Sequence, residues 1–552
     1  MAKATKAAKT IKYSNNLTNK SLEIAASVFF VLITAVFPLY ITRTHYLSIT
    51  GDKAAFFTTI TFITTIVIAG ILFLCTEGFP IKEYFAKRPL TAAEWALLAF
   101  ILFALLSTIF SPFQEVVWRG DPIGRWEGFW TLLCYVLTFF IIARFYKPDR
   151  IHFLIFATGS AIVSAYGILQ FAGLDILVAT GFFVDIPLRD TPQGSVMLPP
   201  LGRIFRTTLG NINVVAAYSA LVSVLFAGLF AGEKSRWGLA YLAASALAFG
   251  LLLISRGDAG SLGVLGAMVL SIPYWVANHE RLGKILIALA SWSAVFAIYN
   301  SYLLSLKVAA ETEPLYFAQD QWFIVNFTAR NTILLAGITI ALLVAGLGLL
   351  LLVRKWRQPH MKIIGIVLMI IIIVSGLVLV ETEGARREGQ PHDGIWQAHE
   401  VMHGRFEDHF GSGRGFIWIR SIPVLTENPF LGSGSGTFLQ AMGVDFQEES
   451  IRRFGIVFDT AHNTYLQMAI TLGIPALLAY LIFLISLYAY LLNKAFVNPI
   501  LLAFGTAAVG YLIQSFFQID TPIDRPLLWV VLGVIAGELC REEASAAIKT
   551  WS

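Results

Sequence analysis

Long apolar runs dominate this sequence. Fourteen segments of about 20 mostly apolar residues lie between residues 22 and 540, and about 20 such residues are enough for a helix to cross a bilayer. A helix satisfies its own backbone hydrogen bonds inside a bilayer, so each run predicts one membrane-spanning helix. We therefore expect an all-α polytopic membrane protein with about 14 transmembrane helices. The runs lie at about 22–41, 55–76, 93–111, 129–146, 151–172, 212–231, 237–254, 260–277, 285–306, 332–353, 361–380, 464–492, 497–518 and 525–540.

The composition agrees with a membrane protein. Hydrophobic residues make up 57% of the chain and charged residues 14%, against about 45–50% and about 25% in soluble domains. These values exclude a soluble enzyme, a disordered chain and a nucleic-acid-binding protein. The three cysteines, Cys75, Cys134 and Cys540, lie in or beside apolar runs, which leaves no disulfide framework for an external domain.

Charge sets the predicted orientation. Residues 1–21 are polar, carry five lysines and precede an apolar run without a cleavage site, so we expect a cytoplasmic tail and a retained first helix. Alternation of the helices then places both termini in the cytoplasm. It also makes 381–463 the largest loop on the outer side, with helical pieces within it. We expect one integral membrane domain over 1–552.

Arginine dominates the segments predicted to lie outside. They hold 16 arginines and only two lysines, Lys53 and Lys307. A guanidinium holds phosphate oxygens with two parallel N–H donors and keeps its charge, so this bias favours a phosphate or diphosphate ligand; pairing of the arginines with nearby acids is the alternative. Two shorter outer segments also stand out, 112–128 for its Trp, Gly and Arg, and 173–211 for its length and its arginines, which include Arg206.

Three local patterns are suited to chemistry. SRGD at 255–258 places charges at a predicted helix end, where either function or snorkelling explains them. SGRGFIWIRSIPVLTENPFLGSGSGTF at 412–438 holds Arg414 and ends in a glycine-rich turn. HNTYL begins at His462, just before a helix. An imidazole there is suited to general base catalysis near neutral pH, and Asn463 orients a ligand or caps the helix.

Together these patterns resemble the O-antigen ligase and O-antigen polymerase superfamily. The resemblance covers about 200–490 and includes FRTTLGNINVVAAY at 205–218. It implies a glycosyltransferase of the bacterial cell membrane that moves a glycan en bloc from undecaprenyl diphosphate to an acceptor hydroxyl on the extracytoplasmic side, without a cofactor or a metal. A single displacement inverts the anomeric centre. A lipid acceptor makes such an enzyme a ligase, a growing chain makes it a polymerase, and a protein side chain makes it a protein O-oligosaccharyltransferase.

The same resemblance implies roles for particular residues. His462 is expected to be the catalytic histidine, and Arg414 and Arg256 the essential arginines of the outer side. Four more residues are expected to bind substrate: Arg420, Asn463, Trp418 and Arg206. The chain departs from the family pattern by an extra helical hairpin at about 332–380, and this hairpin affects the expected position of Arg256.

Two other classes of protein are weighed against this interpretation. HEVMH at 399–403 has the form of a zinc-peptidase signature, with Glu400 as base and His409 where a third ligand would fall. The longer pattern requires glycine at the position of Phe406, so we expect the match to be incidental and predict no metal site. A transporter would place polar groups in mid-membrane and show repeated halves, whereas here they gather on one side and no repeat is found.

Overall fold

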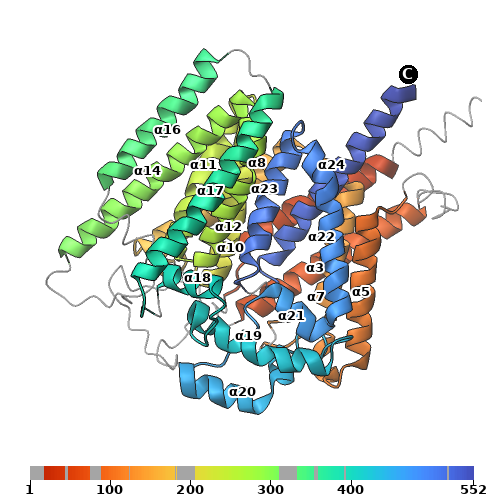
Figure 1. Cartoon of the computed structure of the whole chain (residues 1–552). Coiled ribbons are helices and arrows are strands. Elements are labelled where there is room, and N and C mark those ends of the chain that lie inside the picture. Colours follow the sequence, from red (N-terminus) through yellow and green to blue (C-terminus); the bar gives the residue numbers. More distant parts are fainter. Residues whose placement is uncertain are drawn as a thin grey trace, which may run out of the picture.

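The computed structural model is all-helical in the part of the chain that it describes (Figure 1). It describes residues 18–43, 48–74, 89–122, 125–180, 182, 206–309, 332–353, 358–390, 393–518 and 521–551. No strand occurs within these ranges, which confirms that the fold is all-α in the part that is described. The predicted tail lies outside the described residues as far as residue 17, and so does most of 173–211.

Ten described helices are long and apolar enough to cross a membrane. They indicate a multi-pass membrane protein, as the apolar runs predict. The ten are Thr18–Leu39, α3 (Ile49–Leu74), α5 (Ala92–Phe110), α8 (Arg150–Phe171), α10 (Ile212–Gly232), α11 (Gly238–Ser255), α14 (His279–Ala309), α16 (Thr332–Leu352), α17 (Gln358–Arg386) and α22 (Ile474–Lys494).

The remaining apolar runs also contain helices. Three of these helices are shorter than the ten above: α7 (Phe129–Phe145), α12 (Asp258–Leu270) and α23 (Pro499–Gln514). The fourth, α24 (Arg525–Trp551), continues beyond the predicted end of its run. Each of the fourteen predicted runs therefore holds a described helix. Ten of these helices have the length and hydropathy of a full span.

One predicted run is divided by a bend that hydropathy does not indicate. The run at 464–492 separates at Gly473 into α21 (Thr464–Leu472) and α22. Gly473 has a φ of +87°, and a Cβ at this position would lie 2.2 Å from the carbonyl oxygen of Phe430. Only glycine accommodates both the left-handed backbone and this close approach. The segment after His462 is therefore a separate short helix.

The centre of the bundle is α10. All of its apolar window is buried, and it packs against α11, α23, α12 and α14. A helix that is apolar on every side belongs in such a position. The predicted extra hairpin, α16 and α17, lies at the edge of the bundle (Figure 1), where only 11% and 6% of the two apolar windows are buried.

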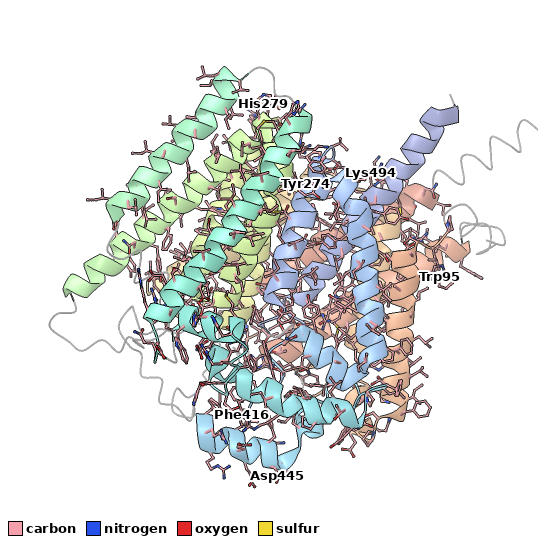
Figure 2. All side chains as sticks on the ribbon, viewed as in Figure 1. Trp95, Tyr274, His279, Phe416, Asp445 and Lys494 are labelled. Carbon is pink, nitrogen blue, oxygen red and sulfur yellow. The ribbon has the colours of Figure 1, made fainter. Side chains whose placement is uncertain are left out.

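Four helices form a cap over one end of the bundle (Figure 1). They are α18 (Gly394–Met402), α19 (Phe410–Glu427), α20 (Phe438–Phe454) and α21. Figure 2 places Phe416 and Asp445 at this end and His279 and Lys494 toward the other. The cap has a small core of its own, made by Phe416, Ile417, Phe438, Met442, Phe446, Phe458, Ala461 and Ile470.

Candidate functional site

His462 lies in the connection between α20 and α21, and its surroundings hold it firmly. Asn463 caps α21, since its side-chain oxygen accepts from the amides of Tyr465 and Leu466 at 3.0 Å each. On the other side, the indole of Trp418 donates to the carbonyl of Ala461 at 2.9 Å. His462 itself has a φ of +48°. A non-glycine residue keeps such a conformation only where its neighbours impose it, and this occurs preferentially at functional sites.

The electrostatic environment keeps the His462 ring neutral. Burial, followed by the nearby charges of Arg414 and Arg125, lowers the pKa of the imidazole from its ordinary value to about 3. Two guanidinium groups therefore act on one partly buried ring. A neutral imidazole has one nitrogen with a free lone pair, which can accept a proton.

Arg414 is the first regularly helical residue of α19. Gly411, Ser412 and Gly413 before it have positive φ angles, so the chain turns sharply and then presents Arg414 to the bundle. Its Nε donates to the carbonyl of Phe517 at 2.9 Å, and Nη1 donates to the carbonyl of Gly411. Trp418, one turn later, faces the same region through its bond to Ala461. The structure thus brings Arg414 and Trp418 to the His462 segment.

Arg256 occupies a different position. It ends α11 with a φ of +57°, and its guanidinium lies beside the Tyr299 phenol of α14. The charges that act on His462 are those of Arg414 and Arg125. Asp258, two residues after Arg256, has Arg414 as its nearby cation. The residue of the SRGD segment that interacts with Arg414 is therefore Asp258, through its carboxylate.

A small polar cavity, the His462 cavity, has a volume of about 40 Å³. Its charged and polar lining includes Arg125, Glu127, His462, Asn463, Gln467 and Arg525. Thr460 and Thr464 also line it, are more than nine-tenths buried, and have no hydrogen-bond partner for their hydroxyls among the described residues. A cavity of this size and polarity has room for water. It is too small for a sugar.

Arg125 and Arg525 are two cationic residues of the cavity lining that the sequence patterns missed. Arg125 forms a two-pronged pair with Asp459 at 3.1 and 2.9 Å. Arg525 is 3% exposed and donates to Glu127 at 3.3 Å. The only sequence signal for Arg125 is the Trp, Gly and Arg content of 112–128. Arg525 is the first residue of α24, and no motif marks it.

A second, larger cavity adjoins the same segment. This Trp126 cavity has a volume of about 960 Å³ and is lined by Asp52, Phe62, Arg119, Trp126, Trp130 and eight other residues. Arg125 and Glu127 face the His462 cavity while Trp126 faces the larger one, so 125–127 forms a wall between them. Both Arg125 and Trp126 have positive φ angles, +54° and +61°, which marks this wall as strained backbone.

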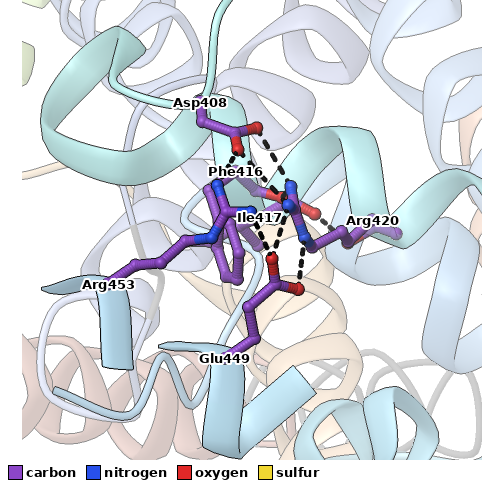
Figure 3. A network of polar contacts seen from close by, with 7 residues as sticks. Asp408, Phe416, Ile417, Arg420, Glu449 and Arg453 are labelled. Carbon is purple, nitrogen blue, oxygen red and sulfur yellow. Dashed lines mark hydrogen bonds and ion pairs between the residues drawn. The ribbon is translucent and has the colours of Figure 1, made fainter. Parts of the chain in front are cut away.

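Arg420 takes part in an ion network within the cap (Figure 3). Its guanidinium donates to Glu449 at 2.9 and 2.8 Å and to Asp408 at 3.0 and 3.3 Å, and it lies 3.9 Å from the ring centroid of Phe416. Arg453 pairs with the same two carboxylates. The side chain expected to bind substrate therefore joins α19 to α20.

The remaining expected residue, Arg206, begins the described segment before α10. Its carbonyl accepts from the amides of Leu209 and Gly210, which makes a turn ahead of the helix. The glycine-rich turn at 432–436 also has a structural role, because the amides of Ser433 and Gly434 donate to the carbonyls of Ile470 and Thr471 at 3.0 and 2.8 Å. The turn thus positions α21.

The lowered pKa of His462 predicts a dependence of stability on pH. The unfolded chain takes up a proton on this ring below about pH 6.5, whereas the folded chain does so only near pH 3. Titration of His462 therefore has no effect on folding above about pH 6.5 and destabilises the fold progressively as pH falls toward 3. We expect the melting temperature of the wild type to fall more steeply between about pH 7.5 and about pH 4 than that of His462→Asn, in which the left-handed backbone is tolerated. Parallel melting curves for the two proteins would contradict this.

Comparison of the sequence with models of known protein families gives one match. Residues 324–481 match the family model described as O-Antigen ligase, a segment that runs from before α16 to within α22 and includes Arg414 and His462. No curated protein matches the chain. The resemblance found in the motifs is thereby confirmed over this segment.

Proposed function

We propose that the chain belongs to the O-antigen ligase superfamily, whose family model matches residues 324–481, and that it transfers a glycan en bloc from undecaprenyl diphosphate to an acceptor hydroxyl on the extracytoplasmic face of a bacterial cell membrane. The observation that carries the proposal is the convergence of a neutral histidine with Arg414 and Arg125 beside a polar cavity. This is the arrangement that the transfer requires, namely a base for the acceptor and cations for a diphosphate leaving group.

The proposed reaction is a single displacement. A ring nitrogen of His462 takes the proton of the acceptor hydroxyl while the acceptor oxygen attacks the anomeric carbon. The bond from that carbon to the diphosphate oxygen breaks, and undecaprenyl diphosphate leaves with the electron pair. The configuration at the anomeric carbon is inverted. The guanidinium groups of Arg414 and Arg125 offset the charge that develops on the leaving group, so catalysis needs no metal.

Donor binding also adjusts the basicity of the histidine. With a pKa of about 3, the ring is a weak base, because burial disfavours its protonated form and two nearby cations add a further unfavourable effect. A bound diphosphate brings negative charge to the same cations and removes that effect. The pKa of His462 then rises toward the working pH, where a general base is most effective. In this proposal the histidine becomes an effective base only after the donor is in place.

The Trp126 cavity is suited to the donor. Its volume of about 960 Å³ is within the range of sites that hold sugar-sized ligands, and its lining combines the faces of Trp126 and Trp130 with the cation of Arg119. We place the glycan diphosphate there, with the strained wall at 125–127 as the part that must move for its anomeric carbon to reach His462. A lipid acceptor makes the enzyme a ligase; a polymerase or a protein O-oligosaccharyltransferase uses the same donor and the same base.

The test is transfer by the purified protein in detergent. Undecaprenyl-diphosphate-linked glycan is supplied with a lipid, a glycan or a peptide acceptor, and release of undecaprenyl diphosphate is followed together with the anomeric configuration of the product. The expected result is release that depends on one acceptor class, with inversion. Release without any glycan product, or a retained configuration, would contradict the proposed displacement.

Metal removal provides a separate prediction. Because the proposed charges come from arginines, chelators should leave the rate of transfer by the folded protein unchanged. Glu400→Gln should have only a small effect on the rate of transfer. Glu400 lies outside the His462 cavity and pairs with Arg405 at 2.6 Å. A strict need for zinc, together with peptidase activity that is lost in Glu400→Gln, would instead favour the metallopeptidase interpretation of HEVMH.

A further inference from the structure

Three metal-ligating side chains meet where α17 packs against α18. Glu381 lies near the end of α17, and His399 and His403 lie one turn apart at the end of α18. The Nε2 atom of His399 is 3.9 Å from one oxygen of Glu381, and Nε2 of His403 is 3.6 Å from the other. One potential ligand atom from each of the three side chains lies within 4.8 Å of the other two. The cluster lies apart from the residues that line the His462 cavity.

Both imidazoles turn the same nitrogen toward Glu381. Nδ1 of His403 lies 2.9 Å from the carbonyl oxygen of His399. A carbonyl only accepts, so this nitrogen carries the proton and Nε2 keeps its lone pair. Nδ1 of His399 lies 3.4 Å from a carboxylate oxygen of Glu400, which favours the same tautomer. Histidines that bind metals through one nitrogen typically donate from the other to a carbonyl or a carboxylate.

The backbone allows this cluster to form because α17 has a glycine at the contact. A Cβ added at Gly384 would lie 2.3 Å from Cβ of His399. Any larger residue would force the two helices apart. The contact is therefore a close one, and it leaves His399 9% exposed while Glu381 and His403 remain open to solvent.

We propose that Glu381, His399 and His403 bind one zinc ion that clamps α18 of the cap to α17 of the edge hairpin. Two imidazoles and one carboxylate are ligands that zinc accepts, with water as the fourth. Tetrahedral bonds of about 2.0–2.1 Å place neighbouring ligand atoms about 3.3 Å apart. The observed 3.6 and 3.9 Å reach the two different oxygens of Glu381, and the three ligand atoms lie within 4.8 Å of one another, so side-chain movements of up to about 1.5 Å would bring them to this spacing. Magnesium and calcium prefer oxygen ligands and fit this set poorly.

The zinc ion in this proposal is structural. Glu400, the base in a peptidase signature, lies on the Nδ1 side of His399 and is held by two bonds to Arg405, so it faces away from the ion. His409, which the longer peptidase pattern would use, is at the start of α19 beside the ring of Phe454. The third ligand comes instead from Glu381 on another helix. The proposal is independent of the proposed glycan transfer.

Binding of Zn²⁺ to the purified full-length chain tests this inference. In calorimetric titration we expect one ion per chain with the wild type and at least about a 100-fold weaker affinity in His403→Ala, because two ligands rarely hold zinc tightly. His409→Ala is the matched control and should bind like the wild type. Zn²⁺ should raise the melting temperature of the wild type and of His409→Ala but not that of His403→Ala.

Two further variants keep the test decisive. Glu381→Gln removes the carboxylate from an exposed position and should weaken binding even if His403→Ala proves unstable. Gly384→Ala keeps every ligand but separates the helices, and it should weaken binding as well. Unchanged zinc affinity in both His403→Ala and Glu381→Gln would overturn the proposal. Loss of binding in His409→Ala would overturn it equally, since the ligands would then be those of the peptidase pattern.

Discussion

Replacing His462 by alanine is expected to lower the rate of glycan transfer by about 10²–10⁴-fold, the usual cost of losing a general base. The fold should persist, because the neighbouring backbone is held by the Asn463 cap and by the bond from Trp418 to Ala461. Donor binding should remain nearly intact, since the expected diphosphate contacts come from arginines. Initial rates of undecaprenyl diphosphate release, with melting curves on the same samples, measure these effects.

Two controls distinguish a lost base from a disturbed loop. His462→Asn removes the base and tolerates the left-handed backbone better than alanine does, so it should be equally inactive and more stable. His409→Ala changes a histidine of the cap outside the His462 cavity and should retain activity. Activity of His462→Ala within a few-fold of the wild type would contradict the proposed role of this residue as the general base.

Replacing Arg414 by lysine is expected to remove most of the activity even though the positive charge is kept. The guanidinium already donates to the carbonyls of Phe517 and Gly411 and must still offer N–H groups to a diphosphate. An ammonium group on a flexible chain cannot make this set of directed bonds. Arg256→Lys should cause a smaller loss, because the Arg256 guanidinium lies beside Tyr299 and is not among the charges that act on His462. Transfer rates and the affinity for undecaprenyl diphosphate in detergent measure both variants.

The matched control for these variants is Arg386→Lys. Arg386 is an exposed arginine at the end of α17 that pairs with Glu383, so its replacement should leave transfer unchanged. Donor affinity that stays at the wild-type value in both Arg414→Ala and Arg256→Ala would show that these arginines do not hold the diphosphate. A loss in Arg414→Ala alone would instead agree with the position of Arg256 beside Tyr299.

The helices of this protein could be predicted because hydropathy is a local property of the chain. A run of apolar residues becomes a helix in a bilayer whatever it packs against, and each predicted run does contain one. The division at Gly473 could not be predicted in this way. It depends on the carbonyl of Phe430, which reaches Gly473 only when the cap has folded onto the bundle.

The residues of the candidate site differ in the same way: local motifs indicate some of them, and only the fold brings in the others. His462, Asn463 and Arg414 were found because they lie within contiguous motifs. Arg125 and Arg525 are 400 residues apart in the sequence, and the fold alone brings both to the His462 cavity. Neither lies in a motif that indicates this position.

Charged side chains show most directly what sequence patterns miss, because the role of a charged side chain depends on the groups with which it pairs. Arg420 was expected to bind substrate, and the fold gives it Asp408 and Glu449 as partners. The HEVMH motif suggested His409 as a third ligand, and the fold places Glu381 there instead. Local patterns thus predict the membrane helices, the resemblance to the family and the candidate histidine. The partners of each charge depend on contacts between distant helices, and these arise only through packing.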